Sequence, residues 1–432
     1  MGSVNDKGKV LNMKDTEIIA NINKLLDYAE TQTGSYSFKE RKASVVNFSK
    51  HIKSIDDVMS FRISDEHSAL YYETFYAVFN KGNIKDNYVI KTFDKKFRDF
   101  LIFSKVKDKE VTKRDFSRFI NGLISAKAEK VIIFHKVFGL EITSVEPVKI
   151  GCFTFYNSSA HISYILKAVD YPTLETLLEY HDEFNKHDVW ISVELEAVDK
   201  EKAYEIACTY FEVFQGICQF VFDIEGYNAY AVCVLNDISP THDRCYIFSQ
   251  ASAMDKAESG FRRVYNINIE QLIHDSNHFF KPLLERISSE NKNDVNNRIS
   301  NAFKTYGRVI HENSEAQKFV MYITAIESLI SYDCPNLSEM ISNYLAAIIS
   351  KNLEEFEISK SHFKKIYSIR SDISHGTITD VLGGDLLYAK WYTMDLIKKY
   401  IIDREIEHFT KNKDLKAHLE SKVVKLRVMS TK

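Results

Sequence analysis

Apolar residues recur at intervals of three and four along the second half of the chain, whereas shorter alternating runs interrupt the first half. From about residue 267 onward the helical interval dominates, which is typical of amphipathic helices that bury one stripe. A first helix is also predicted over 16–31, where Ile18, Ile22 and Leu26 share one side. We therefore predict an α+β protein, with a mixed N-terminal region followed by an all-α C-terminal bundle.

The region between about residues 35 and 156 carries short β-type runs mixed with short helices. Runs at 88–90, 100–103 and 131–134 are rich in β-branched and aromatic residues, and we interpret them as strands. Residues 115–126 are predicted to form a helix. The segment 91–100 interleaves basic and aromatic residues, which suits either a surface strand, the interpretation we favour, or a single-strand RNA contact.

A clearer β-α-β-β pattern follows. Residues 189–197 alternate like a half-buried strand, and Asp199 is well placed to cap the helix that comes next. Two more strands are predicted at 229–235 and 245–248. The polar stretch 252–266 is predicted to be a linker.

The length of 432 residues exceeds what one hydrophobic core normally supports, so several domains are expected. We predict an α+β region over 1–160 and the β-α-β-β unit over 161–255, either as a separate domain or joined to the preceding region. The helical bundle occupies 267–432 and includes a basic C-terminal tail. In its closing helix, Leu387, Trp391 and Ile397 fall at helical spacing and are expected to complete the bundle.

One segment of the bundle combines a fixed cation with a titratable side chain at a helix end. From about residue 361 an apolar stripe runs through Phe363 and Ile366, and Arg370 falls on that stripe, where an unpaired guanidinium would be costly. Gly376 is predicted to end the helix in the left-handed conformation, which leaves His375 in the last turn. The same spacing of arginine and histidine also occurs at Arg62 and His67, so the spacing alone is weak evidence. His375 is either catalytic or a residue that only neutralises its helix end.

Several segments between about residues 294 and 403 together resemble the Apea-like branch of the HEPN superfamily. The hallmark of that branch is Arg-x4-6-His, here Arg370 and His375, followed by Gly376. Residues 297–306, 319–330 and 337–349 resemble its first helix, its ALE-x-L helix and the helix that follows. The resemblance implies an α-helical bundle that acts as an endoribonuclease, in bacterial abortive-infection or toxin systems directed against phage.

The resemblance also implies roles for individual residues. Arg370 would hold the phosphate and His375 would move protons, with no metal or other cofactor required. Ser371 would orient the imidazole, and Glu327 would be the partner of Arg370 or His375; both are equally compatible with plain helix surface. Two modules facing one another would form the cleft, which implies a homodimer. The tyrosine that follows the histidine in some HEPN toxins is replaced by Gly376 and Thr377.

Composition and charge narrow the picture further. The chain has 45% hydrophobic and 27% charged residues and no apolar run long enough to span a bilayer, and its first residues do not resemble a signal peptide, so a cytoplasmic protein without membrane contact is expected. Its six cysteines are expected to be reduced core thiols. His274 and His278 are interpreted as helix residues rather than metal ligands.

The C-terminal segment has a local excess of positive charge, with Lys422, Lys425 and Arg427 as candidate contacts for RNA phosphates; solvated helix ends are the alternative. Two functions from different classes follow. The first is a metal-independent ribonuclease that binds RNA, with the N-terminal region either sensing a phage-derived or cellular trigger or restraining the nuclease. The second is a non-catalytic HEPN scaffold that mediates dimerisation or binds RNA or a partner.

Overall fold

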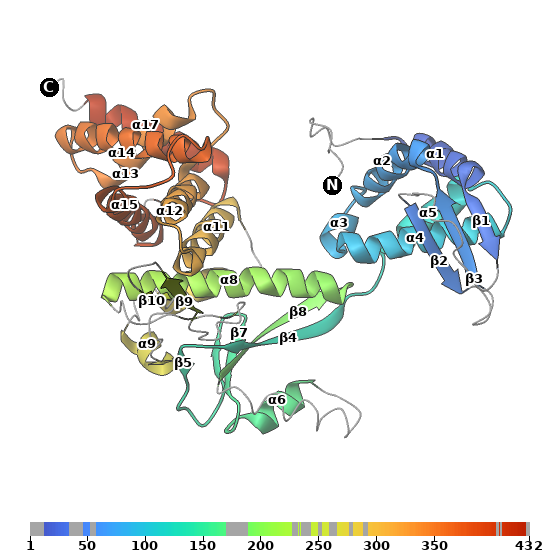
Figure 1. The fold of residues 1–432 in the computed structure, drawn as a ribbon, viewed down its shortest axis with the longest axis horizontal. Helices are drawn as coiled ribbons and strands as arrows, with labels where there is room; N and C mark the ends of the chain where they lie inside the picture. Colours follow the sequence, from blue (N-terminus) through green and yellow to red (C-terminus); the bar gives the residue numbers. More distant parts are fainter. Residues whose placement is uncertain are drawn as a thin grey trace. The chain divides into compact units, whose positions relative to one another are not determined.

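The computed structural model describes residues 13–33, 46–51, 58–169, 189–226, 232, 234, 243–248, 253–258, 266–275, 280–287, 293–402, 406 and 408–428. The protein is α+β, as predicted, with its sheets in the first two thirds and helices over the last third (Figure 1). Its chain forms two compact units, one made of Met1–Val131 with Leu195–Glu205 and the other of Ile132–Glu194 with Ile206–Lys432. The division into three sequential segments stays a prediction.

The first unit combines a small antiparallel sheet with helices. Its elements are α1 (Asp15–Tyr28), β1 (Glu30–Thr33), β2 (Val46–His51), β3 (Val58–Ile63), the 3₁₀ helix η1 (Asp65–His67), α2 (Ser68–Phe79), α3 (Ile84–Asn87), α4 (Ile90–Val106) and α5 (Lys113–Ile124). The strand order is β1-β3-β2, with Thr31 opposite Phe61 and Phe48 opposite Phe61. The predicted helices near residues 16–31 and 115–126 are confirmed as α1 and α5, except that α1 ends at Tyr28 and the last two residues of the first prediction belong to β1.

Helix α4 corrects the strand assignments at 88–90 and 100–103 and the surface strand expected over 91–100. Phe93, Phe97 and Leu101 recur every four residues and are fully buried against α1 and α2, so the segment is an amphipathic helix. Lys95 and Lys96 are exposed, whereas Arg98 is partly buried and pairs with Asp94. Asp199 confirms its predicted capping role, since its carboxylate accepts the Glu201 N–H at 3.1 Å.

The second unit begins with a four-stranded sheet. Its strands and first helices are β4 (Glu129–Val137), β5 (Leu140–Glu141), β6 (Val148–Ile150), β7 (Phe153–Asn157), α6 (Ile162–Val169), β8 (Val189–Ala197), α8 (Lys200–Glu225), β9 (Asp243–Phe248), β10 (Ala253–Glu258), β11 (Ile267–Asn268), α9 (Ile269–Asp275) and α10 (Phe280–Ile287). The sheet order is β4-β8-β7-β6, with β7 antiparallel to both neighbours. Helix α8 covers one face of this sheet, where Phe214 packs against Phe153 and Phe155 (Figure 1).

Three predictions of this region have different outcomes. Strands at 131–134, 189–197 and 245–248 are confirmed as parts of β4, β8 and β9. The linker predicted at 252–266 is wrong over its first half, because β10 pairs antiparallel with β9 there. The strand expected over 229–235 lies outside the described residues except for Val232 and Val234, as does His278; His274 lies in α9.

The last third of the chain is a bundle of helices. These are α11 (Asp294–Arg308), the 3₁₀ helix η2 (Val309–His311), α12 (Glu315–Ile330), α13 (Leu337–Ile349), α14 (Leu353–Ser374), α15 (Gly383–Ile402) and α17 (Asn412–Val428). Helix α11 packs on α12, α12 on α15, and α13 on α14 and α17. The predicted basic tail is therefore, up to Val428, an amphipathic helix that buries Leu415, Leu419 and Val423.

A close crossing joins α8 to the bundle. A Cβ added at Gly216 would lie 1.9 Å from the carbonyl oxygen of Phe303, so only glycine allows the two helices to approach this far. Along the same seam Asp223, 4% exposed, accepts hydrogen bonds from Tyr306 Oη and Lys390 Nζ, both at 2.6 Å. Burial, and then the Asp223 charge, raise the pKa of the Tyr306 hydroxyl well above its usual value. Helices α8, α11 and α15 are thus held together by packing and by charge.

The buried face of α15 differs from the predicted one. Ala389, Tyr392, Thr393, Leu396 and Tyr400 are buried, whereas Leu387 and Trp391 are 68% and 52% exposed. The helix is as predicted, and Ile397 is buried as predicted at 1% exposure, but the N-terminal part of the predicted stripe is not the buried face. None of the helices that the structure describes is both long and apolar enough to cross a membrane.

Candidate functional site

Helix α14 presents the predicted arginine and histidine at its C-terminal end. Its buried residues Phe363, Ile366 and Tyr367 hold one side of the helix against the bundle. Gly376 has φ +73°, which confirms the left-handed residue expected there. The Gly376 N–H donates to the Ile373 carbonyl at 3.0 Å and the Thr377 N–H to the Asp372 carbonyl at 2.9 Å, which is the Schellman pattern. The chain therefore turns sharply just after His375.

Arg370 is held by a carboxylate on the neighbouring helix α12. Its Nη2 lies 3.2 Å from Glu327 Oε2, and the Arg370 and Glu327 side chains are 30% and 14% exposed. The pairing of Glu327 with Arg370 is thus present, which provides the compensation that a guanidinium on an apolar stripe requires. Arg370 Nε is buried and makes no hydrogen bond to any residue that the structure describes.

Tyr367 is a third member of this network that sequence reasoning missed. Its hydroxyl donates to Glu327 Oε1 at 2.7 Å, so each oxygen of the carboxylate has one partner. Burial, and then the bond to Glu327, raise the pKa of the Tyr367 hydroxyl. A buried tyrosine hydroxyl usually requires a hydrogen-bond partner. The position of Tyr367 on the apolar stripe of α14 could therefore have indicated a polar partner nearby. Arg370, Glu327 and Tyr367 form what we call the Arg370 network.

His375 lies at the end of α14 and is exposed. Its main-chain N–H donates to the Ser371 carbonyl at 3.0 Å, and neither its imidazole nor Ser371 Oγ has a hydrogen bond to another described residue. The two side chains are therefore not hydrogen-bonded to each other, although they are four residues apart and neighbours on the helix surface. An exposed imidazole at this position is accessible to a substrate.

Arg370 and His375 leave the helix in different directions. Five residues correspond to about 140° around the axis and about 7.5 Å along it in an ideal α-helix. Arg370 points toward α12, as its bond to Glu327 requires, while His375 projects from the helix end.

The structure places Arg427 away from this pair. Its Nη2 donates to Asn343 Oδ1 at 3.0 Å, and its guanidinium carbon lies 5.8 Å from the centre of the Phe356 ring. Phe356 precedes Arg370 by fourteen residues on α14, a separation of about 21 Å along an ideal helix. Lys422 and Lys425 belong to the same helix α17. Arg427 and the Arg370 network therefore lie toward opposite ends of α14.

The chain has no match among known proteins in any of three comparisons, with protein-family models, with curated proteins and with solved structures.

Proposed function

We propose that this protein is a metal-independent endoribonuclease of the HEPN type, with Arg370 and His375 as its catalytic residues. The observation that carries the proposal is a guanidinium fixed by Glu327 at the same helix end that exposes the His375 imidazole. The sequence resemblance to the Apea-like branch supports the same assignment.

The chemistry available to these two groups suits RNA. The ribose 2′-hydroxyl is the nucleophile, so the enzyme needs a group that moves protons and a cation that stabilises the charge developing on the phosphate. An imidazole removes the proton from the 2′-hydroxyl, the 2′-oxygen attacks phosphorus, and the bond to the 5′-oxygen breaks as that oxygen is protonated. The products are a 2′,3′-cyclic phosphate and a 5′-hydroxyl.

Arg370 acts on the non-bridging phosphate oxygens. Only its Nη2 is used by Glu327, so a planar guanidinium held from one side retains donors for a phosphate. Glu327 and Tyr367 are positioning residues, because they fix the arginine without contacting the substrate. Ser371 keeps its proposed role of orienting the imidazole only if its hydroxyl rotates toward His375 when RNA is bound.

The directions of Arg370 and His375 favour a homodimer in which the two helix ends meet across one cleft. Each phosphate would then be held by one copy and reached by the imidazole of the other. Lys422, Lys425 and Arg427 would contact the RNA outside that cleft. We further propose that the enzyme acts in the cytoplasm as an antiphage abortive-infection or toxin effector, with the N-terminal region sensing a phage-derived or cellular trigger.

A non-catalytic HEPN scaffold is the second candidate, and the surface of α15 favours it. Leu387, Tyr388 and Trp391 are each at least half exposed, and the Tyr388 ring lies 4.5 Å from the ring of His362 on α14. Exposed aromatic and aliphatic side chains that gather on one helix are typical of protein-binding surfaces. Such a surface would serve dimerisation with or without cleavage.

Cleavage by matched variants distinguishes the two functions. Full-length wild type, Arg370→Ala, His375→Ala and His67→Ala are incubated with RNA in EDTA, and the same variants are expressed in cells to measure growth arrest. We expect cleavage and arrest to be lost in the first two variants and retained in His67→Ala, which alters the other arginine-histidine pair of the same spacing. Equal cleavage by all four proteins would exclude the proposed site, and the absence of any cleavage by wild type, with or without phage, would favour the scaffold.

A further inference from the structure

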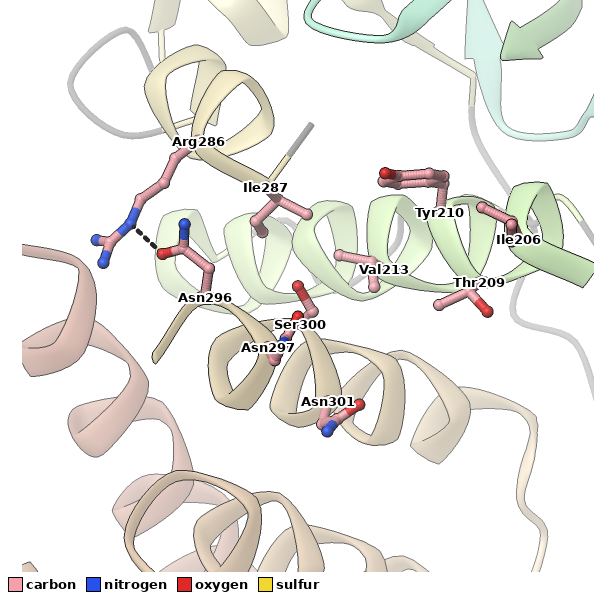
Figure 2. A pocket seen from close by; sticks show the side chains of 10 residues that line it. All are labelled: Ile206, Thr209, Tyr210, Val213, Arg286, Ile287, Asn296, Asn297, Ser300 and Asn301. Carbon is pink, nitrogen blue, oxygen red and sulfur yellow. Dashed lines mark hydrogen bonds between the residues drawn. The ribbon is translucent and has the colours of Figure 1, made fainter. Parts of the chain in front are cut away.

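A cavity of about 360 Å³ lies between α8, α10 and α11 within the second unit (Figure 2). Its volume falls within the range of small-molecule sites. None of its lining residues comes from α12 or α14, so the cavity is separate from the Arg370 network.

The wall formed by α11 is made of amides and a hydroxyl. Ser300 and Asn301 come three and four residues after Asn297, so the three side chains lie on one side of the helix. Their side chains make no hydrogen bond to any other residue in the described part of the chain. In Figure 2, Ser300 points from α11 toward α8. This wall offers donors and acceptors that the protein itself does not use.

Asn296 adds a buried amide to the same wall. It is 7% exposed, and its Oδ1 accepts a hydrogen bond from Arg286 Nε at 2.8 Å. Its Nδ2 has no hydrogen-bond partner among the residues that the structure describes. Because this nitrogen is not among the buried unpaired atoms, it stays accessible, and a ligand in the cavity can accept a hydrogen bond from it. Arg286, oriented by Asn296, places a positive charge at the same end of the cavity.

The opposite wall is largely apolar. It is formed by Ile206 and Val213 of α8 and Ile287 of α10, with the partly buried ring of Tyr210 beside them. An apolar wall facing a row of polar side chains suits a planar heterocycle with a hydrogen-bonding edge.

We propose that this cavity binds an adenine nucleotide. Asparagine amides pair with the N6 and N7 edge of adenine, the apolar wall covers the face of the base, and the Arg286 guanidinium attracts the phosphate. A free nucleotide and one nucleotide of single-stranded RNA share this chemistry.

Binding to the full-length protein tests the site and separates the two sources. AMP, ATP and UMP are titrated into wild type, and octamers of A or U are titrated into the His375→Ala variant so that the RNA stays intact. We expect saturable binding of AMP or ATP, or of the A octamer alone, at least about tenfold tighter than that of the uridine counterpart. Binding of a mononucleotide identifies the free nucleotide as the ligand, and binding of the octamer alone identifies the RNA strand.

Substitutions locate the binding. Asn297→Ala and Asn301→Ala are each expected to weaken it at least about tenfold. Both residues are exposed and alanine favours helix, so these variants fold. Asn121→Ala, on the exposed surface of α5, is the control and should leave affinity unchanged. No saturable binding of any adenine probe, equal affinity for uridine, or unchanged affinity in Asn297→Ala and Asn301→Ala would overturn the proposal. Neither titration depends on cleavage, so this result is independent of the proposed nuclease.

Discussion

At the scale of single residues, the Arg370 network explains how a guanidinium occupies an otherwise apolar helix stripe. Glu327 provides the opposite charge, and the Tyr367 hydroxyl satisfies its second oxygen. The sequence indicated Glu327 as a partner of either Arg370 or His375, because a partly buried cation requires an anion, and the structure pairs it with Arg370. Tyr367 was harder to identify, because the apolar stripe accounts for its ring as a core residue and gives no information about its hydroxyl.

Arg370→Lys tests whether the planar guanidinium matters or only its charge. A lysine ammonium cannot hold two phosphate oxygens in a fixed fork, so we expect RNA cleavage to fall about 100-fold or more with little change in Tm. The rate is measured with a defined RNA in EDTA. Activity close to that of wild type would show that charge alone suffices.

Glu327→Gln tests the positioning of Arg370. The amide keeps the size of the side chain but not its charge, so the guanidinium is held less firmly and kcat should fall about 10- to 100-fold. Tyr367→Phe, which removes only the second contact of Glu327, should have a smaller effect. A Glu327→Gln variant with unchanged kcat and raised KM would instead assign this carboxylate to substrate binding.

At the scale of helices, most elements could be predicted from the sequence, but the side of each helix that is buried could not always be predicted. In α4 the four adjacent apolar residues Phe100–Phe103 are compatible with either a strand or a helix, and we interpreted them as a strand. The helical spacing of Phe93, Phe97 and Leu101 indicates the helix that the structure has. In α15 the predicted and observed stripes have the same period. The sequence pattern favoured the large apolar residues Leu387 and Trp391, which are exposed. The buried face instead includes Ala389 and Thr393, which are small enough to allow close packing.

Gly216→Ala tests the close crossing of α8 and α11. The new methyl would meet the Phe303 carbonyl oxygen at 1.9 Å, so the helices must separate, at a cost of about 2–4 kcal/mol in the free energy of unfolding. Gly122→Ala in α5 is the matched control, since a Cβ there meets nothing within 4 Å, and should stabilise by about 0.5–1 kcal/mol. Thermal unfolding that changes equally for the two variants would contradict the crossing.

Glu339 links α13 to α14 through Lys360 at 2.7 Å and Lys364 at 2.9 Å. Hydrogen bonds from Lys360 and then Lys364 lower the pKa of Glu339 from 4.5 to about 2. A carboxylate with a lowered pKa stabilises the fold fully above pH 4.5, and this contribution disappears as the pH falls toward 2.

Glu339→Gln should therefore lower stability near pH 7 by about 1 kcal/mol, allowing for solvent screening, and by progressively less below pH 4.5. Thermal unfolding of both proteins across this pH range measures the difference. High salt should reduce it at pH 7. A difference that stays constant from pH 7 to pH 3 would show that the ion pairs are not its cause.

At the scale of the whole molecule, the central question is whether two copies share one cleft. Arg370 and His375 diverge by about 140° on their helix, which favours a phosphate held by one copy and attacked with the help of the other. The spacing of five residues already implies this divergence on an ideal helix, whereas only the structure shows that Glu327 directs the arginine toward α12.

Mixed dimers test this arrangement. Arg370→Ala and His375→Ala chains carrying different tags are co-expressed, and dimers that contain one of each are purified by both tags. Each variant alone should be inactive, whereas a mixed dimer retains one intact arginine and one intact histidine on opposite copies and should recover cleavage to about half of the wild-type rate or less. A purified mixed dimer as inactive as its parents would contradict a shared cleft.

The most direct test of the nuclease is the chemistry of its product ends. RNA cut by the full-length protein in EDTA is compared with the same RNA carrying a single 2′-deoxynucleotide at the cleavage position. The account predicts fragments with a 2′,3′-cyclic phosphate and a 5′-hydroxyl, and no cut at the deoxy position. Fragments with a 5′-phosphate, or equal cleavage of the deoxy substrate, would contradict attack by the ribose and with it the roles of Arg370 and His375.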